Sequence, residues 1–280
     1  MKNTIDLHIH TVASDGLHTP TEIVCMACAE GLRTIAITDH DTISSVSEAL
    51  DAARDAPLEV IPGVEISMRT GDVEPHLLGY YVDYTCDAFV DTLARFQSLR
   101  LERAKAIVLR LRHRGIDLSW ERVLDLAGGK SVGRPHIARA MEDAGHVDSF
   151  REAFDAYLAE GKPAYVPRIK MTPVEAIELV DEAGGVPVLA HPWHERSLVP
   201  SLVEAGLVGL EVYYPQYTPS MTARLKRLAR RHRLICTGGS DFHGLSIAPQ
   251  SRLGGVHVPE ACVQALKRER ALQSTSGGIT

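Results

Sequence analysis

Short apolar segments alternate with longer helical patterns along most of this chain, and this alternation constrains the fold more than any other feature. The segment IDLHI at residues 5–9 has the period-2 pattern of a strand, and a helix is predicted to open at Thr19-Pro20. Strands are predicted at residues 4–9, 34–40, 59–67, 76–82, 186–191, 209–214 and 234–241, with helices at 44–55, 173–183 and 219–232. Such alternation is typical of a parallel sheet in an α/β domain, either open or closed into a barrel.

The stretch from residue 87 to residue 162 differs from the rest of the chain. It shows long helical patterns rich in Arg, Glu and Leu, without a convincing strand. The alternation of strands and helices returns after it. We therefore predict one α/β domain formed by residues 1–86 and 163–280, with residues 87–162 as a small helical insertion.

Side chains that can bind a metal ion stand at or just after the ends of almost all the predicted strands. In parallel α/β folds the carboxyl ends of the strands form one edge, where the chemistry gathers. One such residue alone is more often structural, because a lone buried histidine usually just hydrogen-bonds to backbone. A joint set is hard to explain in this way, and it predicts a metal centre. The candidates are His8, His10, Asp15, Asp39, His40, Asp41, Glu65, His76, His191, Glu211, Asp241 and His243.

The charge and the apolar runs exclude several classes of protein. A formal net charge of -6 over 280 residues argues against a protein that wraps long nucleic acid, but allows a local basic pocket. The basic stretch at residues 224–233 carries Leu225 and Leu228, which favours an amphipathic outer helix over an RNA-binding surface. No apolar run approaches a membrane span, so no membrane partner is expected. The five cysteines, with Cys25 and Cys28 on a helical pattern, indicate free thiols and a cytoplasmic location.

Five short motifs carry a resemblance to a known family. The segments DLHIHTVASDG, ITDHDT, PGVEIS, AHP and GSDFH resemble those of the PHP family, the polymerase and histidinol phosphatase superfamily of metal-dependent phosphoesterases. The resemblance covers most of the chain outside the helical insertion. It implies a distorted (β/α)7 barrel of the PHP type, with the insertion as a small helical domain and a centre of two or three metal ions.

The resemblance also implies which residues hold the ions, and these nine residues are then the catalytic ones. The implied sets are His8, His10, Glu65 and Asp241 for one ion, Asp15, His40 and His243 for a second, and Glu65, His76 and His191 for a third. Three carboxylates facing two or three divalent ions leave a positive centre that suits a phosphate dianion. Mixed imidazole and carboxylate ligands favour Mn, Fe or Zn over Ca or Mg.

The insertion contains a second candidate site in the segment VGRPHIARAMEDAG at residues 132–145. Pro135 suits the first turn of a helix, where free amides can hold an anion, and Arg134 and His136 add two donors. A plain helix start with solvated charges would look the same. The segment resembles a subgroup of the family that hydrolyses nucleoside 3',5'-bisphosphates and short 5'-phosphorylated oligoribonucleotides. This resemblance implies that Arg134 and His136 hold a substrate phosphate beneath a helical cap, with Lys162 as a further contact.

The leading expectation is a metal-dependent phosphatase acting on a small nucleotide. A hydroxide bridging the metals would attack phosphorus, and a nucleoside 3',5'-bisphosphate would lose its 3'-phosphate to give a nucleoside 5'-monophosphate. The alternatives are 5'-to-3' exoribonuclease action on short oligoribonucleotides and histidinol phosphate phosphatase activity. An amidohydrolase also uses His-x-His and a late Asp, but no Lys stands near the end of a central strand. A non-catalytic metal-binding module is the remaining alternative. The sequence leaves two interpretations of His194, which is either a proton donor near the leaving group or a residue of the loop surface.

Overall fold

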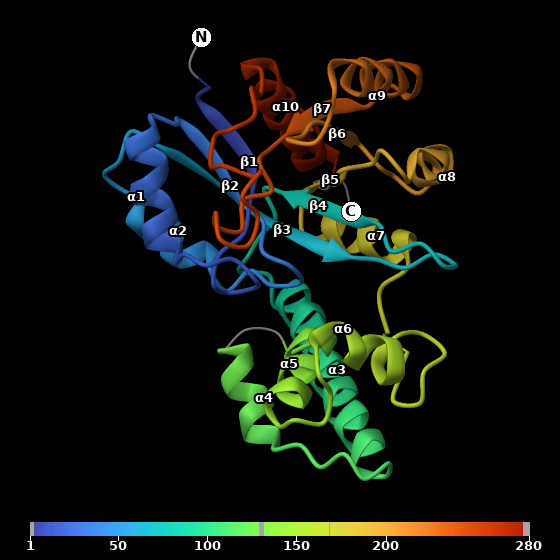
Figure 1. The fold of residues 1–280 in the computed structure, drawn as a ribbon. Helices are drawn as coiled ribbons and strands as arrows, with labels where there is room; N and C mark the ends of the chain where they lie inside the picture. The colour runs from blue at the N-terminus through green and yellow to red at the C-terminus, as the bar shows by residue number, and fades with distance from the viewer. Residues whose placement is uncertain (1–2, 129–131, 168, 277–280) are drawn as a thin grey trace. The chain divides into compact units, whose positions relative to one another are not determined.

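The computed structural model describes residues 3–128, 132–167 and 169–276. The chain divides into two compact units (Figure 1). The first, called the barrel unit here, consists of Met1–Asp91 and Lys170–Thr280, and the second, the helical unit, of Thr92–Ile169. None of the described helices is long and apolar enough to cross a membrane. The five cysteines all lie in the described residues as free thiols.

One seven-stranded sheet organises the barrel unit, and its strands follow one another in chain order. They are β1 (Ile5–Ile9), β2 (Thr34–Ile37), β3 (Glu59–Ser67), β4 (His76–Tyr80), β5 (Val186–Leu189), β6 (Gly209–Tyr213) and β7 (Ile235–Gly238). All pairs are parallel except those of β4, which runs antiparallel to both β3 and β5. The prediction of an all-parallel sheet is therefore wrong at β4. The reason is that residues 68–75, between β3 and β4, are too few for a crossover to a parallel strand.

The two ends of the sheet meet, so that the sheet is nearly closed into a barrel. The backbone N–H of His10 donates to the carbonyl of Phe242 at 2.9 Å, and the N–H of Phe242 donates to the carbonyl of His8 at 3.3 Å. Closure requires a glycine at position 239, because a Cβ there would lie 2.4 Å from the backbone nitrogen of His8. The distorted barrel of seven strands predicted from the sequence is confirmed.

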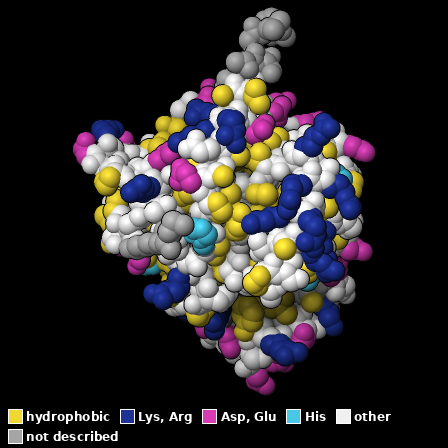
Figure 2. Space-filling view, turned by 90° about the horizontal axis from the view of Figure 1, so that it is seen from above, with side chains coloured by type: hydrophobic (Ala, Val, Ile, Leu, Met, Phe, Trp, Pro, Cys, Tyr) yellow, Lys and Arg dark blue, Asp and Glu magenta, His cyan; other side chains and the backbone are white. Residues whose placement is uncertain are grey.

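Helices cover the sheet of the barrel unit. They are α1 (Pro20–Glu30), α2 (Val46–Ala52), α7 (Pro173–Glu182), α8 (Val199–Glu204), α9 (Pro219–His232) and α10 (Glu260–Ser276). Three of them, α1, α7 and α9, begin where the sequence predicts. Thr19 caps α1 and Glu22 returns the bond to the Thr19 backbone, which satisfies two free amides. On α9 the side chain of Leu225 is buried, whereas Arg224 and Arg227 are exposed, as expected for an outer amphipathic helix. Figure 2, which shows the molecule of Figure 1 from above, has basic side chains gathered over the part of the surface where α9 lies.

The helical unit has its own hydrophobic core. Its helices are α3 (Asp87–Arg112, which begins in the barrel unit), α4 (Trp120–Ala127), α5 (Arg134–Asp143) and α6 (Phe150–Ala153), followed by a π-helical turn (Phe154–Leu158). Ile107, Leu111, Val123 and Ile137 are buried together in this core. No strand occurs among the described residues of this unit, in line with the helical character read from the sequence.

Candidate metal centre

One edge of the barrel brings together all nine residues that the resemblance implies as ligands. Five of the six parallel strands, all except β6, supply eight of them at their carboxyl ends or from the loops that follow. His76 reaches the same edge by a different route, because it is the first residue of the antiparallel strand β4. Its place at this edge therefore depends on the strand direction that the sequence prediction missed.

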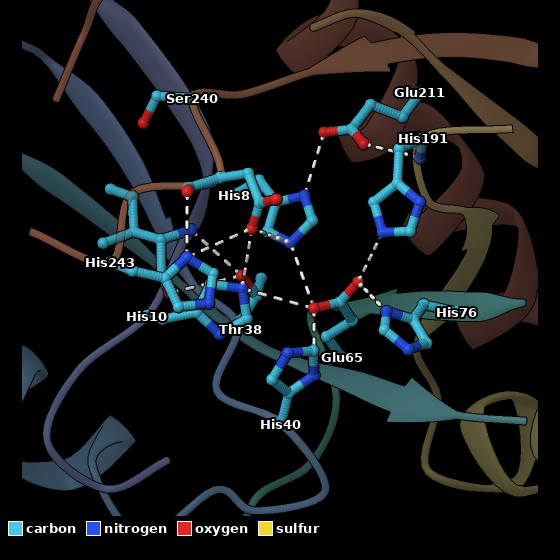
Figure 3. Close-up of polar contacts among 12 residues, drawn as sticks. His8, His10, Thr38, His40, Glu65, His76, His191, Glu211, Ser240 and His243 are labelled. Atoms are coloured by element: carbon cyan, nitrogen blue, oxygen red, sulfur yellow. Dashed lines mark hydrogen bonds and ion pairs between the residues drawn. The ribbon is translucent and has the colours of Figure 1, made fainter. Parts of the chain in front are cut away.

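Glu65 lies at the middle of the cluster, and its side chain is 1% exposed (Figure 3). Its Oε2 atom lies 3.2 Å from Nε2 of His8, 3.2 Å from Nε2 of His10 and 3.1 Å from Nδ1 of His40. Its Oε1 atom lies 3.0 Å from Nδ1 of His76 and 3.2 Å from Nε2 of His191. One carboxylate thus joins two subsites, with a different group of imidazoles at each oxygen.

Three overlapping groups of ligand atoms lie close enough to hold metal ions, each within 4.8 Å of one another. The groups are His8, His10, Glu65 and Asp241; His10, Asp15, His40 and His243; and His40, Glu65 and His76. The first coincides with the set implied for one ion. The second adds His10 to the set implied for another ion. The third group contains Glu65 and His76 of the set implied for the third ion, with His40 in place of His191. His191 instead contacts Oε1 of Glu65. Metal binding by these residues stays a prediction.

Several buried polar atoms at the centre have no hydrogen-bond partner among the described residues, and they test whether a cation fits. They are Nε2 of His8, both ring nitrogens of His10, Nδ1 of His40 and Oε2 of Glu65. Each such atom costs about 1–3 kcal/mol when left unsatisfied. Metal bonds of about 2.0–2.2 Å place neighbouring ligand atoms about 3 Å apart. The nitrogens of His8 and His10 lie 3.1–3.4 Å from the facing oxygens of Glu65 and Asp241, so these residues fit divalent ions.

The charges at the centre shift neighbouring pKa values in opposite directions. Burial lowers the pKa of His10, but its close contacts with the carboxylates of Asp241 and Glu65 outweigh burial and raise it to about 10. Burial also lowers the pKa of His40; Glu65 opposes this and His10 adds to it, leaving a value of about 4. Burial would raise the pKa of Asp241, yet the charges of His8 and His10 hold it well below its usual range. The carboxylates therefore stay ionised and attract positive charge.

Glu211 was a candidate metal-binding residue from the sequence but is outside the nine implied ligands, and the structure gives it a positioning role. Its side chain is fully buried, and Oε1 lies 3.0 Å from Nδ1 of His8. Its Oε2 accepts the backbone N–H of His191 at 2.7 Å. Because a carboxylate oxygen accepts, Nδ1 of His8 carries a hydrogen, which leaves Nε2 as the ring nitrogen that faces the centre and can bind a metal. An acid inside the apolar strand segment GLEVYY was the only signal of this role in the sequence.

Asp39 and Asp41 were also candidates from the sequence, and the structure gives them structural roles. Asp39 accepts hydrogen bonds from the N–H and hydroxyl of Thr11, each at 2.7 Å, and from the hydroxyls of Ser14 and Ser45. Asp41 accepts the backbone N–H of Ser67 at 2.8 Å. The bonds to Asp39 hold the loop that carries Asp15 in place beside His10.

Two predicted ligands stand on strained backbone. His191 has φ of 30° and Asp241 has φ of 52°, in the left-handed region that residues other than glycine rarely adopt. The buried Asp6 fixes the segment before Asp241 by accepting the N–H of Ser240 at 2.8 Å and its hydroxyl at 2.6 Å. Tyr214 donates its hydroxyl to Oδ2 of Asp241 at 2.8 Å. These contacts hold Asp241 in one orientation.

The three predicted substrate contacts lie in the helical unit. Arg134, the first residue of α5, donates to the carbonyl of Leu158 at 3.2 Å. Its guanidinium lies 5.7 Å from the ring centre of Phe154 and 5.8 Å from that of Tyr165. Nδ1 of His136 accepts a hydrogen bond from the N–H of Gly133 at 3.1 Å, and thus caps the start of α5. Lys162 is exposed, as is His194 in the barrel unit.

Comparison with known proteins places these observations in a wider group. The family model for the PHP domain matches residues 6–160. The chain is 38% identical over 248 residues to the 5'-3' exoribonuclease Rnm of Salmonella typhimurium, covering 85% of this chain and 84% of that protein. It is 33% identical over 247 residues to the 3',5'-nucleoside bisphosphate phosphatase of Chromobacterium violaceum, covering 85% and 87%. A crystal structure from Bifidobacterium adolescentis, assigned as a metal-dependent phosphoesterase, has a TM-score of 0.79 at 33% identity, covering 95% and 96%.

Proposed function

Because the chain belongs to the PHP domain family and is a metal-dependent phosphoesterase, we propose that it removes the 3'-phosphate from nucleoside 3',5'-bisphosphates. The product would be a nucleoside 5'-monophosphate. The observation that carries the proposal is the buried Glu65, whose two oxygens face five imidazoles, several with ring nitrogens that have no hydrogen-bond partner among the described residues. Such a set of side chains is suited to bind divalent ions next to a phosphate.

Divalent ions bound here would supply positive charge for the phosphoryl oxygens and lower the pKa of an attacking water molecule. The part of the chain itself is to hold and orient the ligand atoms. Glu211 fixes the ring of His8, Tyr214 fixes Asp241, and the bonds to Asp39 fix the loop of Asp15. The ligand atoms are thereby kept in place before substrate binds, which is the condition for electrostatic stabilisation of the transition state.

A substrate with two phosphates needs a second group that binds an anion. Arg134 suits this role, because its guanidinium stands at the start of α5 and is oriented by the Leu158 carbonyl and two aromatic rings. His136 has Nδ1 occupied as an acceptor, so its ring hydrogen is on Nε2. We propose that Arg134 and His136 bind the phosphate that does not react. Lys162 adds positive charge near that phosphate.

The second candidate function is 5'-to-3' exonuclease action on short 5'-phosphorylated RNA. The name of the Salmonella relative favours it. Both reactions would use the same metal centre, and they differ in the length of the substrate and in the bond that is hydrolysed.

A substrate panel tests the proposal and separates the two functions. Protein loaded in turn with Mn, Fe and Zn is assayed with a nucleoside 3',5'-bisphosphate, the 3'- and 5'-monophosphates, histidinol phosphate and a short 5'-phosphorylated RNA. The expected result is fastest release of phosphate from the bisphosphate, with the 5'-monophosphate as product. Faster release of mononucleotides from the RNA would assign the exonuclease function instead. Preference for histidinol phosphate would refute both.

A further inference from the structure

Aromatic side chains gather beside the metal centre on two loops of the barrel unit. Strands β5 and β6 are parallel neighbours, so the loops after them rise from the same edge. The loop after β5 carries Trp193, two residues beyond His191, and the loop after β6 carries Tyr214 and Tyr217. All three aromatic side chains are half-buried, which leaves part of each ring open to a ligand. We call Trp193, Tyr214 and Tyr217 the aromatic shelf.

The shelf is continuous with the metal centre. The ring of Tyr214 lies 5.7 Å from that of His191, and its hydroxyl binds Asp241. The ring centres of Tyr214 and Tyr217 are 5.1 Å apart, and those of Tyr217 and Trp193 are 6.3 Å apart. A row of π-systems therefore connects Trp193 through Tyr217 and Tyr214 to two predicted metal ligands.

The rings of the shelf are held in place without any ligand. The hydroxyl of Tyr217 accepts the backbone N–H of Trp193 at 3.1 Å, which ties the two loops together. The guanidinium of Arg196 stacks on Trp193, with its central carbon 3.9 Å from the ring centre. One guanidinium nitrogen of Arg196, Nη1, is buried and has no hydrogen-bond partner in the described part of the chain. A ligand that stacks here would meet a preformed surface.

We propose that the aromatic shelf binds the base of the nucleotide substrate, with Arg196 holding Trp193 in its orientation. This inference rests on the proposed function and adds to it the part of the barrel that recognises the nucleoside. Every nucleobase has a π-face, and stacking on aromatic side chains is tolerant of sequence. A flat aromatic group one sugar away from a phosphate at the metal centre is the chemistry that this surface matches.

Kinetics with and without the base provide the first test. Trp193→Ala is compared with wild type on a nucleoside 3',5'-bisphosphate and on 1-deoxyribose 3,5-bisphosphate, which lacks the base. Loss of one stacking ring should lower kcat/KM for the nucleotide about 5- to 150-fold, mainly through KM. The base-free substrate should change less than about twofold, because it makes no stacking contact. Trp193→Phe should recover most of the loss.

The control removes an aromatic ring of the barrel unit far from the shelf. Tyr84 is also half-buried, but it follows the end of β4, the antiparallel strand that begins at the metal centre with His76. Tyr84→Ala should keep wild-type kinetics with both substrates. Bound metal is measured in each variant. Equal losses on the two substrates by Trp193→Ala, or no loss on either, would overturn the proposal.

Fluorescence decides the question even if the wild type does not hydrolyse nucleotides. The chain has two tryptophans, Trp120 and Trp193. In Trp120→Phe the only tryptophan is Trp193, which is excited at a wavelength that tyrosine does not absorb. This variant is titrated with nucleoside 5'-monophosphate, base-free sugar phosphate and inorganic phosphate. Saturable quenching by the nucleotide alone would support the shelf as a base site. Unchanged emission, or the same response to all three, would refute the shelf. A failure of the proposed function would instead show in the wild-type activity panel.

Discussion

Glu211→Gln should weaken metal binding without changing the shape of the buried side chain. Glu211 accepts from Nδ1 of His8 and from the N–H of His191. A glutamine offers one oxygen to these two donors and turns its NH2 group toward the other. If His8 responds by moving its hydrogen to Nε2, that nitrogen loses the lone pair that faces Glu65 and Asp241.

The size of the effect follows from these two contacts. A hydrogen bond to a charged group contributes about 1.5–3 kcal/mol, and 1.4 kcal/mol is about a factor of ten in affinity. Replacing the partner that orients a histidine ligand typically costs about 10- to 100-fold in metal affinity or activity. We therefore expect about 10- to 100-fold weaker metal binding in Glu211→Gln, with much of kcat restored at saturating metal.

The assay is competition with a chelator of known affinity, followed by turnover at rising metal concentration. Glu59→Gln is the matched control. It makes the same change at the start of β3, the opposite end of the strand that carries Glu65, where Glu59 pairs with Lys267 at 2.8 Å on the surface. Exposed ion pairs contribute about 0–1 kcal/mol to stability, so the fold should be kept. Because Glu59 lies at the other end of β3 from Glu65, metal affinity should not change. Wild-type affinity in Glu211→Gln would refute the reasoning, as would an equal loss in the control.

Three further predictions concern the predicted ligands and the predicted phosphate contact. His10→Ala and Asp241→Asn should each lower bound metal and phosphatase activity together, and full occupancy in elemental analysis with normal turnover would remove either from the site. Arg134→Ala should keep its metal but lose about ten- to a hundredfold in kcat/KM for a 3',5'-bisphosphate, and much less for p-nitrophenyl phosphate. Arg134→Lys, which keeps the charge, controls for folding, and equal losses on both substrates would refute the assignment. Because the pKa of His10 is raised to about 10 in the metal-free protein, a metal must displace its proton at neutral pH; affinity measured by competition should rise with pH between 7 and 9, and a constant affinity would contradict this.

The parts of the fold and site that could be predicted from sequence are those fixed by local pattern. Period-2 runs and capping residues identify strands and helix starts, since the signal lies within a few residues. His8 and His10 could be placed together because they alternate along one strand. The direction of β4 depends on the length of its connection, and the prediction overlooked how short residues 68–75 are.

The contacts that orient the ligands could not be predicted, because their partners are distant in the chain. Glu211 meets His8 across 203 positions, and Tyr214 meets Asp241 across 27. Nothing in the segment GLEVYYPQYTP specifies those partners. They arise because β6 lies beside β7, and β7 is followed by the segment that pairs with β1.

Hydrogen-bond partners distinguish acids with a structural role from those suited to a metal, even where both kinds lie near the carboxyl end of a strand, as Asp39 and Glu65 do. Asp39 has its oxygens occupied by one backbone N–H and three hydroxyls, and Asp6 by backbone N–H groups and the Ser240 hydroxyl. Glu65 has an oxygen without any hydrogen-bond partner in the described residues, and it faces imidazole nitrogens instead. A carboxylate satisfied by N–H and O–H donors has little left to offer a cation, whereas one facing ring lone pairs is stable only if a cation, or a proton on the ring, lies between them. The raised pKa of His10 shows the proton taking that place when no metal is bound, so the metal and the proton compete for the same lone pairs.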